Sequence, residues 1–302
     1  MKNKVVLVGC GNVGMSFAYA LVNQQTYVDE LVLIDIDEEK IIGEAMDLNH
    51  SLPYCPSKLS VKIGKYEDCA DARIVVIAAG SNQAPGETRM DLIHKNSRIF
   101  KSIIDPIMAS NFNGIFIVAT NPLDVMTYLT LKYSKLPVSR VIGSGTTLDT
   151  ARLRYMISDK IKIASDNIEA YVIGEHGDSE FVPWSNASIG LTSIDNFLTK
   201  EDMESIEKDV RESAYEIIKR KGATYYGIGA ALAKITKAIL EDKNEILSVS
   251  SYDTNNDVCI STPAIVGASG VKRKIHIPLN QEETQKLTYS INVIKDAIKS
   301  IE

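Results

Sequence analysis

Residues 5–14 read VVLVGCGNVG, an apolar run that leads into three glycines. The order of an apolar strand, then Gly9, Gly11 and Gly14, then a helix is typical of a tight turn that holds a pyrophosphate at the helix N-terminus. Glycine-rich turns are common, so the three glycines alone are a weak signal. Their position directly after a β-branched run makes this stretch the start of a predicted dinucleotide-binding βαβ unit.

The end of the second apolar run strengthens this interpretation. The run LVLID ends at Asp35, 21 residues after Gly14, which is close to the spacing of the carboxylate that binds a ribose diol. A carboxylate there would repel a 2′-phosphate, so NAD is favoured over NADP. Cys10 inside the loop is interpreted as a small packing residue. An α/β protein that binds no nucleotide remains the alternative.

Farther along the chain, short apolar runs alternate with helical patterns. These runs contain no polar alternation, as expected for parallel strands that helices cover on both faces; they are 5–8, 31–34, 74–78, 115–118 and 141–142. The rhythm predicts an α/β fold whose first part is a Rossmann doubly wound parallel sheet. We place an NAD-binding domain at 1–143 and an α+β substrate-binding, catalytic domain at 144–302.

The second half predicts a strand-like stretch at 170–174 and two long helices. The first helix has an apolar stripe and ends near Gly222; its stripe is Met203, Ile206, Val210, Ala214 and Ile217. The second opens with a capping pair, Asn280 and Glu283, and its stripe is Leu287, Ile291, Ile294, Ile298 and Ile301. Each helix could serve a subunit interface or pack on the sheet.

Composition excludes several classes of protein. The 302 residues carry 33 Lys and Arg against 39 Asp and Glu, a net charge of −6, which argues against a nucleic-acid or anionic-membrane partner. No apolar run approaches the ~20 residues that span a bilayer, and the N-terminus has no signal-peptide pattern. The four cysteines are far apart, without metal-ligand spacing. We therefore expect a cytoplasmic protein with reduced thiols and no metal.

Four polar clusters follow apolar runs, where an open α/β sheet binds its ligand. They are the loop at 80–89 with Gln83 and Arg89, the segment 120–124 with Asn121 and Asp124, the pair Asp149 and Arg152, and the loop 174–178 around His176. Asp149 and Arg152 are three residues apart and share a helix face, which would also suit a plain ion pair. Among the four histidines, His176 between two glycines is the best candidate for acid–base chemistry.

Taken in order, the segments of the chain resemble the L-lactate dehydrogenases of the lactate/malate dehydrogenase family over nearly its whole length. The matching segments are VGCGNVG, LVLID, AGSNQAPGETRMDL, ATNPLDV, GSGTTLDTARLR, IGEHGDSE and KGATYYGIG. The resemblance implies an NAD-dependent oxidoreductase of glycolysis and fermentation that interconverts (S)-lactate and pyruvate. It also implies a cytoplasmic homotetramer.

The resemblance further implies a role for each matching residue. His176 would exchange a proton with the substrate oxygen, Asp149 would orient its ring, Arg152 would bind the substrate carboxylate, and Arg89 would approach the reacting carbonyl on a closing loop. The remaining substrate-side positions are Gln83, Asn121, Asp124 and Thr224. The cofactor-lining positions are Gly9, Gly11, Val13, Gly14, Asp35, Lys40, Tyr66, Gly80, Ser81, Ser102, Ala119, Asn121 and Ser144.

Two features of the sequence bear on specificity. Gln83 is neutral where malate dehydrogenases of the family have an arginine, which favours pyruvate over oxaloacetate, although Ala84 replaces a lysine common in bacterial members. Many bacterial relatives bind fructose 1,6-bisphosphate with an arginine and a histidine; Arg154 matches the first, but Glu169 replaces the second, so we expect weak or absent activation. The alternatives are a dehydrogenase for 2-hydroxyisocaproate or malate, or an NAD-binding structural or sensor protein without turnover.

Overall fold

The six short strands of the first half form one parallel sheet. In this computed structural model, which describes residues 2–81, 86 and 88–301, the sheet extends to nine strands. In spatial order they are β12 (Gly270–Lys274), β11 (Val258–Gly267), β10 (Glu245–Asp253), β6 (Val141–Gly143), β5 (Ile115–Val118), β4 (Ile74–Ile77), β1 (Lys4–Val8), β2 (Glu30–Ile34) and β3 (Ser60–Ile63). The order from β6 to β3 is that of the Rossmann fold, and it confirms the predicted doubly wound sheet.

Three antiparallel strands from the second half continue the same sheet. β10 pairs with β6 through Ser250 and Gly143, and with β11 over nine residue pairs. We did not predict these strands. Serine occupies three of the nine positions of β10, and Pro263 lies inside β11, so neither stretch has the apolar pattern of the earlier strands.

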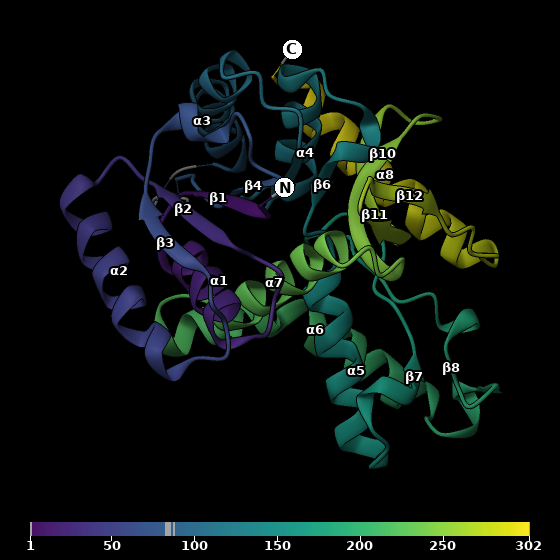
Figure 1. Cartoon of the computed structure of the whole chain (residues 1–302). Helices are drawn as coiled ribbons and strands as arrows, with labels where there is room; N and C mark the ends of the chain where they lie inside the picture. Colours follow the sequence, from purple (N-terminus) through teal and green to yellow (C-terminus); the bar gives the residue numbers. More distant parts are fainter. Residues whose placement is uncertain (1, 82–85, 87, 302) are drawn as a thin grey trace.

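Helices cover both faces of the sheet (Figure 1). Alternate residues of each strand point to opposite faces, so Val6 and Val75 belong to one core and Leu7 and Val76 to the other. The helices α3, α4 and α8 pack on the first face and α1, α2 and α7 on the second. The eight helices of the described residues are α1 (Asn12–Asn23), α2 (Glu38–Ser51), α3 (Arg89–Ala109), α4 (Leu123–Ser134), α5 (Thr147–Ile161), α6 (Lys200–Lys221), α7 (Tyr226–Leu240) and α8 (Gln281–Lys299).

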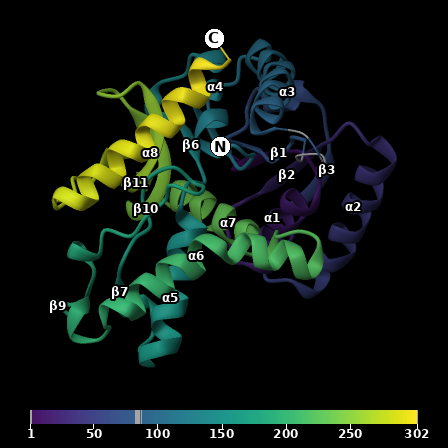
Figure 2. The same cartoon turned by 180° about the vertical axis from the view of Figure 1, so that it is seen from behind.

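A third, smaller core lies beside the main sheet. It joins α5 and α6 to a three-stranded sheet, whose strands are β7 (Ile168–Glu169), β8 (Ser188–Ile189) and β9 (Thr192–Ser193). Seen from behind in Figure 2, this lobe projects away from α2 and β3. It confirms the α+β character of the second half.

The two predicted long helices are present. α6 ends at Gly222, whose positive φ of 84° suits glycine, and α8 begins with the predicted capping box of Asn280 and Glu283. The stripe of α8 packs on the sheet, since Ile291, Ile294 and Ile298 are buried in the first core. In α6 only the stripe positions Ile206 and Val210 are fully buried.

The prediction of a strand at 170–174 is wrong. Only Ile173 and Gly174 form isolated bridges, to Phe181 and Ser261 respectively. The hydroxyls of Thr146, Thr150 and Ser248 bind the backbone of Val172 in place of a strand partner. Among the described residues, no helix is both long and apolar enough to cross a membrane.

Candidate functional site

The loops after four parallel strands meet at one edge of the sheet. Backbone hydrogen bonds join each strand end to the next loop: Gly9 N–H to Ile34, Ala78 N–H to Val8, Ala119 N–H to Ile77 and Ser144 N–H to Val118. This edge is where an open parallel sheet binds its ligand. Gly9, Ala119 and Ser144, three of the predicted cofactor-lining positions, lie at this edge.

The glycine loop has the shape that a bound pyrophosphate requires. Gly9 has a φ of 99°, and a Cβ there would collide with the backbone of Ala79. A Cβ at Gly14 would collide with the carbonyl of Gly9, so the helix α1 can approach the loop only with glycine at this position. A Cβ at Gly11 would meet no heavy atom within 4 Å. The loop therefore has open space at its outer face, next to the N-terminus of α1, and fits a dinucleotide.

Asp35 lies beside this loop. Its carboxylate accepts a hydrogen bond from the backbone N–H of Cys10 at 2.6 Å and another from Asp37 N–H at 3.1 Å. Burial, with a further contribution from Asp35, raises the pKa of the Cys10 thiol to about 12. Cys10 thus stays a neutral packing group, as interpreted from the sequence, and Asp35 is held where it can meet a ribose.

Asn96 on α3 links two of the site loops, and we did not predict it. Its fully buried amide accepts from Ser81 N–H at 2.8 Å and donates to the carbonyls of Ser81 and Asn121. A polar residue between Ile93 and Phe100 on the buried face of a helix was the available signal. Asn96 fixes the predicted positions Ser81 and Asn121 relative to each other.

His176, Asp149 and Arg152 form one connected group. The Nδ1 atom of His176 lies 2.8 Å from Asp149 Oδ2, and Arg152 donates to Asp149 Oδ1 at 2.7 Å. Asp149 is 2% exposed and the His176 side chain 26% exposed, so the ring reaches solvent while its partner does not. Burial opposes the imidazolium, but the Asp149 carboxylate outweighs it, and the pKa of His176 lies well above its usual value. Burial likewise opposes ionisation of Asp149, and His176 and Arg152 together hold its pKa below the usual value.

Asp124 holds the backbone of His176 in place. It is 2% exposed, and its two oxygens accept from Ser250 Oγ at 2.5 Å and from the backbone N–H of His176 at 2.8 Å. Burial raises the pKa of Asp124 to about 6. The placement differs from the substrate contact expected for this residue, because both oxygens face the protein interior.

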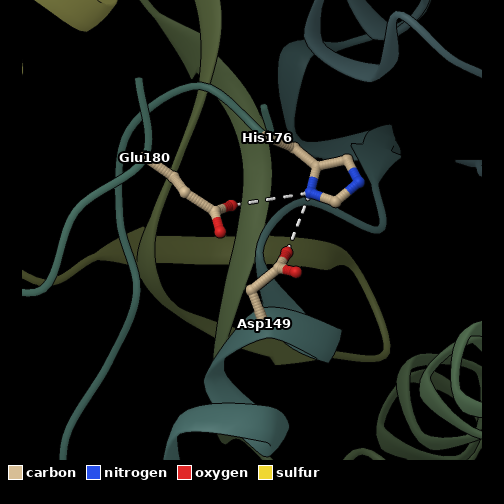
Figure 3. A group of neighbouring side chains, drawn as sticks. All are labelled: Asp149, His176 and Glu180. Carbon is tan, nitrogen blue, oxygen red and sulfur yellow. Dashed lines mark hydrogen bonds and ion pairs between the residues drawn. The ribbon is translucent and has the colours of Figure 1, made fainter. Parts of the chain in front are cut away.

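Glu180 is a second carboxylate near the imidazole that the sequence did not reveal. Figure 3 shows Glu180 and Asp149 on the same side of the ring, with the other ring nitrogen facing away from both. Glu180 Oε2 lies 3.8 Å from Nδ1, and its side chain is 6% exposed. Burial, with a contribution from Asp149, raises the pKa of Glu180 to about 7. The only signal was an acidic residue close to the histidine in the same loop.

The side chains of Asp149, His176 and Glu180 form a group of potential metal ligands. Each offers one ligand atom, and these atoms lie within 4.8 Å of one another. A metal there would displace the proton of Nδ1 and face the Arg152 guanidinium across Asp149. The arrangement suits a histidine that exchanges a proton through its outward nitrogen better than a metal centre.

The other predicted positions lie on several elements and differ in their burial. Val13 lies in the first turn of α1, and Gly80 is packed against Thr120 at the sheet edge. Lys40 in the first turn of α2 is exposed, Tyr66 is partly buried against the first core, and Thr224 is partly buried between α6 and α7. Ser102 lies exposed in the body of α3, where its hydroxyl donates to the carbonyl of Ile99. Gln83 and the side chain of Arg89 lie outside the described residues, as does Ala84.

Arg154 and Glu169 lie next to each other on the lobe of α5. Arg154 Nη2 is 3.9 Å from Glu169 Oε2, its Nε donates to the carbonyl of Ala170, and its guanidinium lies 4.7 Å from the centre of the Tyr171 ring. The arginine therefore has an anion and an aromatic face within its own chain.

Comparison with known proteins matches nearly the whole chain to one family. The family model described as lactate/malate dehydrogenase, NAD binding domain, matches residues 3–143, and the model of the alpha/beta C-terminal domain of the same family matches residues 146–302. An L-lactate dehydrogenase of Halalkalibacterium halodurans is 52% identical over 97% of this chain and 96% of its own length. A lactate dehydrogenase from a Medee basin deep-sea metagenome library superposes with a TM-score of 0.97 at 51% identity, covering 100% and 99% of the two chains. A minor L-lactate dehydrogenase from Enterococcus mundtii, in a ligands-bound form, has a TM-score of 0.97 at 42% identity, with the same coverage.

Proposed function

The chain belongs to the lactate/malate dehydrogenase family, and from this membership we propose that it is an L-lactate dehydrogenase that interconverts (S)-lactate and pyruvate with NAD. The observation that carries the proposal is the connected group of His176, Asp149 and Arg152, which Asp124 ties to the loop after β5. The glycine loop after β1 lies at the same edge of the sheet and fits a dinucleotide. Relatives about half identical over nearly the full length are L-lactate dehydrogenases.

His176 is the proposed acid and base. Asp149 accepts a hydrogen bond from Nδ1–H, so the outward nitrogen, Nε2, is the atom that exchanges a proton with substrate. In the reduction of pyruvate, protonated Nε2 gives its proton to the carbonyl oxygen, and His176 becomes neutral. In the oxidation of lactate, neutral Nε2 takes the hydroxyl proton, and the charge of Asp149 stabilises the imidazolium that forms. The glycine loop and Asp35 would hold NAD, which would supply the hydride for the reduction and take it up in the oxidation.

Arg152 is the proposed anchor of the substrate carboxylate. One of its terminal nitrogens is occupied by Asp149, and its side chain is 13% exposed. The remaining N–H groups of a guanidinium can pair with two carboxylate oxygens, which orients the substrate next to the imidazole. Arg89 would stabilise charge on the reacting oxygen when its loop closes, and Asn121 would assist beside the nicotinamide. Asp124 would position His176 through its backbone.

Gln83 is the proposed determinant of substrate choice. Opposite a neutral amide, the second carboxylate of oxaloacetate would be desolvated without a countercharge, whereas the methyl group of pyruvate has no such cost. The first experiment follows NADH absorbance with pyruvate and oxaloacetate at matched concentrations. Preference for pyruvate supports the lactate assignment, and preference for oxaloacetate contradicts it. NADH binding without turnover of either would favour a larger 2-keto acid or a sensor protein.

Regulation by fructose 1,6-bisphosphate is proposed to be weak or absent. The Glu169 carboxylate beside Arg154 would repel a bisphosphate and competes for the same guanidinium. The half-saturating pyruvate concentration should therefore change little when the bisphosphate is added. A large decrease would contradict the proposal.

The remaining proposals concern organisation. We propose an NAD-binding part at 1–143 and a substrate-binding part at 144–302, a cytoplasmic location and a homotetramer. Light scattering coupled to size-exclusion chromatography would test the last, and a monomer at micromolar concentration would contradict it.

A further inference from the structure

Two carboxylates face one nitrogen of the imidazole, and they do so at different distances. Asp149 Oδ2 lies 2.8 Å from Nδ1 and Glu180 Oε2 lies 3.8 Å from the same atom. Nδ1 carries one proton, and the shorter distance gives that hydrogen bond to Asp149. Glu180 therefore acts on the ring through its charge.

The backbone holds Glu180 in this position. Its own N–H donates to Gly177, and the next residue, Phe181, exchanges two hydrogen bonds with Ile173. Both sides of the loop 174–180 are thus tied together around His176. Among the described residues, the ion-pair contact of the Glu180 carboxylate is to His176.

The other carboxylates near the ring each have a different partner within the chain. On α5, Asp149 is paired with Arg152. On α4, Asp124 binds the His176 backbone and Ser250. In the loop, Glu175 accepts from Ser179, and Asp178 is exposed and accepts from Tyr215 on α6. Among the described residues, two carboxylates lie against the ring. Asp149 has an ion pair with Arg152, whereas the ion pair of Glu180 is with His176 itself.

We propose that Glu180 is a positioning residue whose buried carboxylate sets the pH at which His176 gives up its proton. This inference rests on the proposed function of His176 as acid and base. An ionised Glu180 stabilises the imidazolium and extends pyruvate reduction to higher pH. With the pKa of Glu180 raised to about 7 by burial, its charge is present in the alkaline range where His176 loses its proton.

The test compares Glu180→Gln with the unmodified enzyme. The pH profile of kcat/KM for pyruvate is measured at saturating NADH, and its alkaline midpoint should move down by about one pH unit in the variant. The acid limb of lactate oxidation should move in the same direction. Glu180→Asp keeps the charge one methylene farther from the ring and should give a smaller shift; this keeps the test decisive if the glutamine variant is unstable. Asp178→Asn removes one exposed charge from the same loop and should leave the midpoint in place.

A second measurement does not depend on turnover. The His176 ring is titrated by NMR in the enzyme without substrate, with His176→Gln to assign the signal. A lower midpoint in Glu180→Gln supports the proposal, and an unchanged midpoint in a folded variant overturns it. If the unmodified enzyme fails to oxidise NADH with pyruvate, the proposed function fails, and the NMR titration still decides the role of Glu180.

Discussion

The carboxylate of Asp124 on α4 accepts a hydrogen bond from the backbone N–H of His176, 52 residues later in the chain, at 2.8 Å. Ser250 on β10 donates to the other oxygen. One buried side chain therefore joins the loop of the proposed acid–base residue to both halves of the sheet.

Asp124→Ala should damage both stability and activity. It leaves the His176 N–H and the Ser250 hydroxyl without their acceptor, which should lower the free energy of unfolding by roughly 2–4 kcal/mol. Asp124→Asn can still accept from His176 and donate to Ser250, so it should lose much less. Urea unfolding and kcat/KM for pyruvate check both variants. Equal losses in the two would mean that the charge of Asp124 matters and the hydrogen bonds do not.

Asp149→Asn should nearly abolish turnover while leaving the fold intact. The amide cannot stabilise the imidazolium, and by analogy with other His–Asp pairs kcat/KM should fall by about 10²–10⁴-fold. Asp159→Asn, an exposed change at the other end of α5, is the matched control. Near-normal activity of Asp149→Asn would remove Asp149 from the mechanism.

Asp35→Ser should relax the preference for NADH. Without the carboxylate, a 2′-phosphate is no longer repelled, and the ratio of kcat/KM for NADPH to that for NADH should rise at least about tenfold, or ~1.4 kcal/mol. Asp37→Asn keeps the cap of α2 and should leave the ratio unchanged. A constant ratio in Asp35→Ser would assign cofactor choice to other residues.

Gln83→Arg should shift turnover toward oxaloacetate. The new cation pairs with the second carboxylate, and the preference should change by on the order of 10²-fold or more. Ala84→Lys, which adds a cation at the adjacent position, shows whether placement matters. This prediction rests on the family resemblance, since position 83 lies outside the described residues.

Glu180→Gln should stabilise the protein at alkaline pH. Burial raises the pKa of Glu180 from 4.5 to about 7, so the native state binds this proton more tightly than the unfolded chain does. The free energy of unfolding therefore falls as pH rises through this window. The variant should gain on the order of 1–3 kcal/mol at about pH 8 and nothing at about pH 4. Urea unfolding at both pH values checks this, and a gain that is the same at both would contradict the linkage.

The sequence predicts the parallel sheet well and the antiparallel part poorly, for a physical reason. Strands such as β4, whose residues are all buried, show as unbroken apolar runs. In β10, two buried serines bind groups from distant parts of the chain: Ser250 donates to Asp124 and Ser248 to the carbonyl of Val172. The residues Asn96 and Glu180 were missed because a buried polar group has meaning only beside its partner, which lies far away in sequence or across a loop.

The pairing of β6 with β10 predicts how the chain would behave if it were cut between the two family domains, after residue 143. Gly143 lies on β6, and its partner Ser250 lies on β10, so the two family domains complete one another's sheet. A fragment ending at residue 143 would expose the open edge of β6 and lose the helix α7 that packs on α1 in Figures 1 and 2. Unpaired edges and bare apolar faces favour self-association. Each half expressed alone should therefore self-associate.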